Sequence, residues 1–429
     1  MRQTDPVLTD LDPTVDFCDF ITASPSSYHA AAEILRRCRD AGFREQVETD
    51  PFDATPGGHV LIRDGAALAY RLPAFIDETT TARIVVCHTD SPGFKLKPNP
   101  TERHHGYAQA GMEVYGGPLL PSWLDREFGL AGRVVTRQGE SKLVETGPWL
   151  RIPALAIHLD RSANESLHLD QQRHLLPVTG LAGDDDLLDL VAEAAGLTDA
   201  SDIAGHDLFA ATTEPPARIG RFGDLLATRR LDNLSSVWSG LDALLSLGDE
   251  TVDDIVVLAA FDHEEIGSAT RSGAQGPLLG DLLDRILTAA GVTGDDHHRL
   301  FARSWVISAD AGHAGHPNYP ERFDPVAFPL VNGGPLLKVN AKQRYASDAH
   351  GAALWTRCCE TAEVPHQVFV SNNAVPCGTT VGPLTATRTG LRTVDVGIGL
   401  LSMHSARELC GVEDPAYLSG ALAAFYRGA

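Results

Sequence analysis

Apolar runs of strand length and segments with helical apolar spacing alternate along most of this chain. Helical spacing covers residues 28–38, directly after the start signal Ser24-Pro25-Ser26-Ser27. Short apolar runs at 58–62, 66–71 and 82–88 follow, and each has the length and composition of a strand. The pattern therefore predicts an early helix followed by strands.

The pattern changes between about residues 93 and 218. Glycine and proline interrupt the chain often here, with short strands predicted at 133–136 and 154–159 and a helical patch at 184–195. A change of this kind is typical of a module inserted into another domain. We predict one domain built from residues 1–97 and 219–429, with residues 98–218 inserted between its two parts.

Helix-like and strand-like segments alternate again after the insertion. Helices are predicted at 233–247, 278–290, 349–362, 382–389 and 416–425, and strands at 255–261, 304–309, 367–370 and 391–396. Such alternation favours an α/β fold in which helices cover both faces of a mostly parallel or mixed sheet.

Charge and cysteine usage narrow the classes of function. The 429 residues include 57 acidic and 35 basic residues, a formal charge of -22, and no run of basic residues. A nucleic acid would be repelled, and an acidic substrate would need local cations inside a pocket. The seven cysteines are scattered without CxxC spacing, which favours reduced thiols.

The chain offers no membrane or export signal. Residues 1–12 are polar, and the longest strongly apolar run, 255–261, is far shorter than the ~18 residues that a membrane helix requires. We therefore expect a cytoplasmic protein without a membrane partner.

Polar side chains gather at the predicted strand ends, where ligands bind in open α/β sheets. They are His88, Asp90, Glu264, Glu265, Asp310 and His404, with Asp232 at the start of a helix. Imidazoles and carboxylates together are typical of a catalytic zinc site, and a bridging carboxylate would allow two ions. The sequence thus predicts a metal centre at one edge of the sheet.

Several of these residues also have simpler interpretations. His88 alone would be a histidine at the edge of the core, but Asp90 shares its face in an extended segment and could hold its second ring nitrogen. Asp232 could equally cap a helix. Glu264 and Glu265 fit either a solvated acidic turn or a ligand beside a general base.

Two further histidines and the glycine-rich stretches carry less evidence about the chemistry. His313 and His316 could be metal ligands or polar groups of a loop. The glycine-rich stretches lack the pattern of a phosphate-binding loop, and no Gly-x-Ser-x-Gly motif supports covalent hydrolysis.

Seven segments in order resemble the aspartyl aminopeptidase family. They are 20–30 (FITASPSSYHA), 88–93 (HTDSPG), 115–118 with 123–126 (YGGP, WLDR), 230–233 (RLDN), 262–268 (DHEEIGS), 308–310 with 316–319 (SAD, HPNY), and 403–408 (MHSARE). The resemblance spans most of the chain. It implies a three-layer α/β/α zinc-peptidase catalytic domain with an inserted, mainly β dimerisation domain, assembled as a tetrahedral dodecamer.

The resemblance also implies an activity and a site. The expected reaction is removal of N-terminal Asp or Glu from peptides, with two Zn²⁺ ions that Co²⁺ or Mn²⁺ can replace. The implied ligands are His88, Asp232, Glu265, Asp310 and His404. In this scheme Asp232 bridges the ions, His88 and Asp310 hold one of them, and Glu265 and His404 hold the other.

The remaining roles come from the same resemblance. Glu264 is implied as the general base, and Asp90 as the residue that orients His88. Lys338, with Tyr345 close by, is implied to accept the acidic side chain of the substrate, which supplies the local cation that the net charge demands. His158 is implied to reach into the site of a neighbouring subunit.

Two rival functions remain open at this level. A general aminopeptidase or a deacylase would use the same metal site without Lys338. A non-catalytic oligomeric scaffold would keep the fold alone, but such a protein has no chemical reason to fill every catalytic position. Gly312 and Gly315 depart from the bulkier residues that the family often has there, which affects loop geometry more than chemistry.

Overall fold

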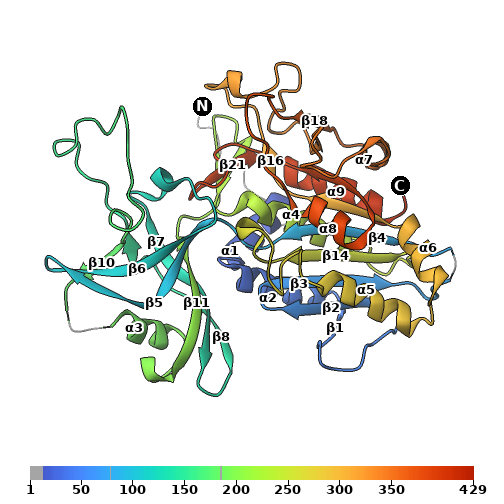
Figure 1. Ribbon diagram of the computed structural model, residues 1–429, viewed down its shortest axis with the longest axis horizontal. Helices are drawn as coiled ribbons and strands as arrows, with labels where there is room; N and C mark the ends of the chain where they lie inside the picture. Colours follow the sequence, from blue (N-terminus) through green and yellow to red (C-terminus); the bar gives the residue numbers. More distant parts are fainter. Residues whose placement is uncertain (1–12, 78, 184–185) are drawn as a thin grey trace, which may run out of the picture.

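The computed structural model describes residues 13–77, 79–183 and 186–429, and these form two lobes (Figure 1). The polar segment 1–12 and the first two residues of the helix predicted at 184–195 lie outside the described residues. The α-helices in the described ranges are α1 (Pro13–Ala23), α2 (Ser27–Asp40), α3 (Leu187–Ala194), α4 (Leu231–Leu245), α5 (Leu278–Ala289), α6 (Asp295–Arg303), α7 (Ala349–Thr361), α8 (Val381–Thr389) and α9 (Asp414–Tyr426).

The larger lobe is built on a mixed sheet. Its strands, as far as the chain is described, lie in the order β1 (Arg44–Glu45), β2 (Gly57–Arg63), β3 (Ala66–Leu72), β14 (Ile255–Phe261), β4 (Ala82–His88), β15 (Trp305–Ala309), β19 (Arg392–Gly397), β17 (Leu336–Val339) and β18 (Gln367–Val370). The four neighbours β14, β4, β15 and β19 run parallel to one another. Their carboxyl ends therefore lie at the same edge of the sheet.

Helices cover both faces of this sheet. One face packs against α1, α2, α4, α7 and α9, and the other packs against α5, α6 and α8. Every residue of β14 is buried, with Val256 and Leu258 facing one helix layer and Val257 and Ala259 facing the other. Burial on both faces explains why this strand is a continuous apolar run. The predicted three-layer α/β/α arrangement is confirmed.

The smaller lobe is a closed sheet. Its strands follow the order β11 (Ile203–Thr212), β5 (Gly93–His104), β6 (Tyr107–Tyr115), β10 (Val178–Leu181), β9 (Leu150–Arg151), β7 (Glu127–Thr136) and β8 (Ser141–Glu145). Because β11 pairs with both β5 and β7, the sheet closes on itself around a core that includes Phe94, Phe128 and Leu208. Helix α3 packs Leu187 and Val191 against the same core.

Two further small sheets are present in the described ranges, and an ion pair joins the two lobes. The short strands are β12 (Ala217–Ile219), β13 (Leu225–Thr228), β21 (Glu408–Gly411), β16 (Gly312–His313) and β20 (Gly399–Leu400). Arg133 on β7 pairs with Asp64 of the larger lobe, with Nη1 2.8 Å from Oδ1. The Arg133 guanidinium also lies 4.4 Å from the centre of the Tyr28 ring.

The sequence analysis placed most elements of the larger lobe correctly and several of the smaller lobe wrongly. The strand predicted at 154–159 is a loop, because its apolar side chains Leu155, Ile157 and Leu159 point to solvent instead of packing against a neighbour. The long strands β5 and β6 were missed, since charged residues, proline and glycine interrupt their alternation. No helix in the described ranges combines the length and apolarity that a bilayer span requires.

Candidate metal centre

The ligand candidates meet at the shared carboxyl edge of the parallel strands. His88 ends β4, Asp310 follows β15, and Glu265 follows β14 after a short connection. His404 comes from the loop between β20 and β21, and Asp232 lies in the first turn of α4. The structure thus brings together residues that are up to 316 positions apart in the chain.

Asp232 lies between the two imidazoles. Its Oδ1 is 3.3 Å from His88 Nε2, and its Oδ2 is 3.4 Å from His404 Nε2. A second carboxylate faces each imidazole, with Asp310 Oδ1 3.7 Å from His88 Nε2 and Glu265 Oε1 3.4 Å from His404 Nε2. Two groups of three potential ligands share Asp232, and a third group joins His88 with Glu264 and Glu265.

The helix-cap interpretation of Asp232 is wrong. A helix cap accepts a backbone N–H from the first turn, and in the described chain no backbone N–H of α4 donates to the Asp232 side chain. Asp232 Oδ1 is buried and accepts no hydrogen bond from any part of the chain that the structure describes. A buried carboxylate oxygen without a donor is costly unless a cation satisfies it.

Asp90 ties His88 to the segment that carries the two glutamates. The ring Nδ1 of His88 lies 3.1 Å from the Asp90 backbone carbonyl and 3.3 Å from Asp90 Oδ1. The Asp90 carboxylate accepts the backbone N–H of Glu264 at 3.0 Å and that of Glu265 at 3.1 Å. Asp90 therefore fixes the backbone of Glu264 and Glu265 as well as the ring of His88.

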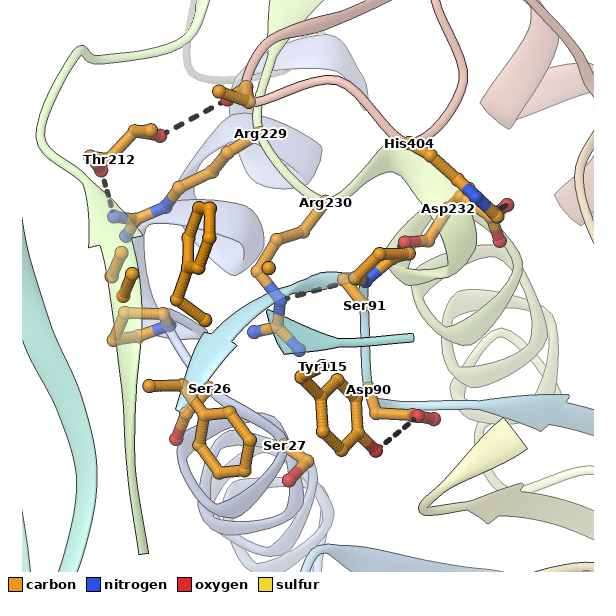
Figure 2. A pocket seen from close by; sticks show the side chains of 18 of the residues that line it. Ser26, Ser27, Asp90, Ser91, Tyr115, Thr212, Arg229, Arg230, Asp232 and His404 are labelled. Carbon is orange, nitrogen blue, oxygen red and sulfur yellow. Dashed lines mark hydrogen bonds and ion pairs between the residues drawn. The ribbon is translucent and has the colours of Figure 1, made fainter. Parts of the chain in front are cut away.

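The smaller lobe contributes directly to the centre through the segment that ends β6. The Tyr115 hydroxyl donates to Asp90 Oδ2 at 2.8 Å, and His404 Nδ1 lies 3.0 Å from the Gly117 carbonyl oxygen (Figure 2 shows the Tyr115–Asp90 bond). Gly116 has φ +66°, and a Cβ there would lie 3.1 Å from the Glu265 Cβ. Only glycine fits both the angle and the close approach.

The electrostatics of the cluster favour positive charge. Burial opposes protonation of both imidazoles, but the adjacent carboxylates, Asp232 first, raise the pKa of His88 well above its ordinary value and that of His404 to about 10. Burial also opposes ionisation of Asp232, yet His404 and His88 lower its pKa. Burial raises the pKa of Glu264 to about 7. An excess of carboxylates over cations explains these directions.

The residues present therefore fit divalent metal. Nitrogen and oxygen donors in this mixture are typical of catalytic zinc, and the orphaned Asp232 Oδ1 faces the place where an ion would satisfy it. His88 and His404 each have a carbonyl oxygen near the ring nitrogen that points away from Asp232, as metal-binding imidazoles usually do.

Lys338 and Tyr345 lie together beside the centre. Lys338 is 1% exposed, and its Nζ donates to the carbonyl oxygen of Ala311, the residue after Asp310, at 2.8 Å. The same Nζ is 5.3 Å from the centre of the Tyr345 ring. In the described ranges no carboxylate lies within ion-pair distance of this ammonium. The Lys338 ammonium therefore has a neutral carbonyl oxygen, and no carboxylate at ion-pair distance, as its close partner among the described residues.

The other candidate histidines lie elsewhere. His158 is exposed in the loop that follows β9. His313 packs edge-on near Phe369, and His316 accepts the backbone N–H of Asn318 at 3.2 Å. Neither His313, the last residue of β16, nor His316 belongs to a possible metal-binding group of the described residues.

A pocket of about 50 Å³ lies behind the ligand cluster, between the two lobes (Figure 2). The Arg230 guanidinium extends into it and donates to Ser91 Oγ at 3.3 Å, to the Thr89 carbonyl and to the Ser24 carbonyl. Ser91 Oγ in turn donates to the Asp232 carbonyl oxygen at 2.6 Å. This chain of contacts supports the backbone on either side of the cluster.

Sequence reasoning missed the supporting residues Tyr115, Gly117 and Glu408. Tyr115 and Gly117 had been interpreted as part of a turn, because they lie in the smaller lobe and far from His404 in the chain. Glu408 lies in the 403–408 segment, where nothing distinguishes it from a surface glutamate. Only the spacing of four residues from His404 hinted at contact between them.

Comparison with known proteins gives a consistent result. The model of the family "Aminopeptidase I zinc metalloprotease (M18)" matches residues 20–426. A probable M18 family aminopeptidase 2 of Streptomyces avermitilis is 50% identical over 432 residues, which cover 99% of this chain and 100% of the relative. The protein of the same name in Mycobacterium tuberculosis is 42% identical over 419 residues, 95% of this chain and 96% of the relative.

Two solved structures superpose closely on this chain. A chain in the cryo-electron microscopy structure of an Ape4–Nbr1 complex superposes with a TM-score of 0.91 at 33% identity, covering 96% of this chain and 85% of that one. The Saccharomyces cerevisiae mApe1 dodecamer superposes with a TM-score of 0.85 at 28% identity, covering 97% of each chain.

Zinc should stabilise the folded protein through this centre. At a free concentration 100-fold above its dissociation constant, a bound ion adds roughly 2.7 kcal/mol to the free energy of unfolding. We expect the unfolding temperature of the metal-free protein to rise by several degrees when zinc is added, as measured by differential scanning fluorimetry. The shift should shrink in Asp232→Asn and persist in Asp249→Asn, an exposed control. An equal shift in all three proteins would contradict the assignment.

Proposed function

The chain belongs to the M18 family of zinc metalloproteases and is a metallo-aminopeptidase, and from this premise we propose that it removes acidic N-terminal residues with two zinc ions per subunit. The buried, unpaired ammonium of Lys338 beside the metal centre is the observation that carries the proposed specificity.

Two ions are supported by the way the ligands divide around Asp232. His88 and Asp310 face its Oδ1, while His404 and Glu265 face its Oδ2. Two Zn²⁺ ions would carry four positive charges, which matches the ionised carboxylates of Asp232, Asp310, Glu265 and Glu264. Donor sets of this kind discriminate poorly between divalent metals, so Co²⁺ or Mn²⁺ should substitute.

When bound by these ligands, zinc would supply Lewis-acid activation of a water molecule and of the scissile carbonyl group. Asp232 and its four partners supply two ligand groups that do not need Glu264, and Glu264 acts as the general base beside them. Its carboxylate accepts a proton from the attacking water and delivers it to the departing amine. Asp90 holds the Glu264 backbone, so the base is fixed in place before the substrate arrives.

The Lys338 pocket addresses the substrate's first side chain. An acidic side chain that enters would neutralise an ammonium whose only close partners are a carbonyl oxygen and the face of Tyr345. A leucine side chain in the same place would leave the ammonium unpaired. The enzyme's net charge of -22 repels acidic peptides at a distance, which makes this short-range attraction necessary.

We also propose that residues 98–218 form a dimerisation domain between the two catalytic segments, and that the protein assembles as a dodecamer. Leu155, Ile157 and Leu159 are 63%, 44% and 74% exposed in one loop of the smaller lobe, and clustered exposed apolar side chains mark interfaces. His158 lies within this loop, where assembly would present it to a neighbouring subunit. The dodecamer of S. cerevisiae mApe1 supports the stoichiometry.

Replacement of the general base tests the mechanism. Glu264→Gln keeps the shape of the side chain but cannot accept a proton. We expect kcat to fall roughly 10²–10⁴-fold while the zinc content is unchanged. Release of p-nitroaniline from Asp-p-nitroanilide, with metal analysis of the same sample, measures both, and Glu360→Gln on the surface of α7 is the control. A variant that retains more than a tenth of wild-type kcat would exclude Glu264 as the base.

Removal of the buried charge tests the specificity. In Lys338→Met we expect kcat/KM for an N-terminal Asp substrate to fall roughly 10–100-fold, the worth of a charged hydrogen bond of about 1.5–3 kcal/mol. Activity on a Leu substrate should stay the same or rise, which also shows that the variant is folded. Lys342→Met, an exposed lysine four residues away, is the matched control. Wild-type activity confined to Leu substrates would instead favour a general aminopeptidase.

A charge in the exposed loop tests the assembly. Leu159→Glu should prevent burial of this loop and lower the molar mass measured by light scattering, whereas Phe75→Glu, at an exposed position of the larger lobe, should not. A wild-type protein of single-subunit mass, or a Leu159→Glu variant of unchanged mass, would refute the proposed interface.

A further inference from the structure

Glu408 joins the backbone of two metal-ligand candidates. It is the first residue of β21 and is 2% exposed. Its Oε2 accepts the backbone N–H of Asp232 at 3.0 Å, and its Oε1 accepts the backbone N–H of His404 at 2.7 Å. One side chain thereby connects segments that lie 172 positions apart in the sequence.

Neither ligand candidate is held by regular secondary structure. His404 has φ +65°, and Ser402 two residues earlier has φ +56°, in a region that side chains other than glycine rarely adopt. A residue in that conformation costs roughly 1–2 kcal/mol and persists only where its surroundings enforce it. Asp232 interrupts the helical angles at the start of α4. Both backbones therefore need an external constraint.

Glu408 is itself held in place by the pairing of two strands. Strand β21 pairs antiparallel with β13, and Glu408 lies opposite Thr228. Two residues, Arg229 and Arg230, separate Thr228 from Leu231 and Asp232. The pairing of β13 with β21 thus fixes the Glu408 backbone relative to the segment before Asp232. The Glu408 carboxylate adds a second connection, to the Asp232 backbone N–H.

We propose that Glu408 is a positioning residue for the half of the metal centre that contains His404. It holds the His404 and Asp232 backbones so that His404 Nε2 and Asp232 Oδ2 converge to 3.4 Å, and it belongs to no possible metal-binding group of the described residues. This inference rests on the proposed two-zinc site. Asp90 has the corresponding role for the backbone of Glu264 and Glu265.

The chain contains a matched control. Asp414, at the start of α9, is 1% exposed, and its carboxylate accepts the backbone N–H of Asn332 at 2.7 Å and that of Gly334 at 3.1 Å. Asp414 therefore makes the same kind of double contact as Glu408, at a place that holds none of the ligand candidates. Stability lost by removing such a contact should be similar for the two residues, so any additional effect at Glu408 belongs to the metal centre.

The experiment compares Glu408→Gln with Asp414→Asn in the full-length protein. Each amide leaves one buried N–H without its acceptor. We expect Glu408→Gln to bind the second zinc 10–100-fold more weakly, as measured by calorimetric titration of the metal-free protein, which is the usual effect of disturbing groups around metal ligands. At limiting zinc kcat should fall while KM for the Asp substrate is nearly unchanged, and excess zinc should restore kcat. Asp414→Asn should bind zinc as the wild type does.

Several outcomes would overturn the inference. Zinc affinity and kcat of Glu408→Gln equal to those of Asp414→Asn would show that Glu408 serves stability alone. Failure of excess zinc to restore kcat in a folded Glu408→Gln would give it a different role. If Glu408→Gln does not fold, Glu408→Asp, which keeps both oxygens on a shorter side chain, takes its place under the same criteria. A wild-type protein that binds one zinc would refute the two-zinc proposal itself, independently of the variants.

Discussion

The burial of several carboxylates at one sheet edge is the constraint on which the rest of the structure depends. Asp232, Asp310 and Glu265 lie close to two imidazoles that cannot neutralise them all. Such a cluster is unstable in a protein interior unless cations enter it and backbone N–H groups hold the carboxylates around it. The parallel strands, the loops held by Asp90 and Glu408, and the contacts from the smaller lobe all keep these side chains in place.

Support for the centre comes in two layers with different physical character. The inner layer consists of side chains that point at one another across 3.3–3.7 Å. The outer layer consists of Asp90 and Glu408, each of which accepts backbone N–H groups from the segments that carry the inner residues. Fixing a ligand by its backbone leaves the end of its side chain free, which suits a site that must exchange substrate and product without losing its geometry.

Sequence reasoning predicted the inner layer, Asp90 and the central sheet, but not Glu408 or most strands of the smaller lobe. Strand β14 was found because burial on both faces requires a continuous apolar run, and α2 was found because Ser26 caps it, accepting the His29 N–H. Residues 154–159 look like a strand because apolar residues recur at alternate positions, yet those side chains face solvent in the single chain. Tyr115 left no local signal, since its partner Asp90 lies in another segment, and Glu408 offered only its spacing of four residues from His404.

The contact between the end of β6 and the metal centre has a consequence for how the enzyme can be altered. Tyr115 and Gly117 reach Asp90 and His404 from the smaller lobe, and Gly116 passes close to Glu265. A shortened enzyme made by deleting the smaller lobe would lose part of the framework around the metal-ligand candidates, however well the remaining sheet folded. Attempts to build a minimal catalyst on this scaffold must therefore retain the β6 tip or replace the three backbone and hydroxyl contacts that it provides.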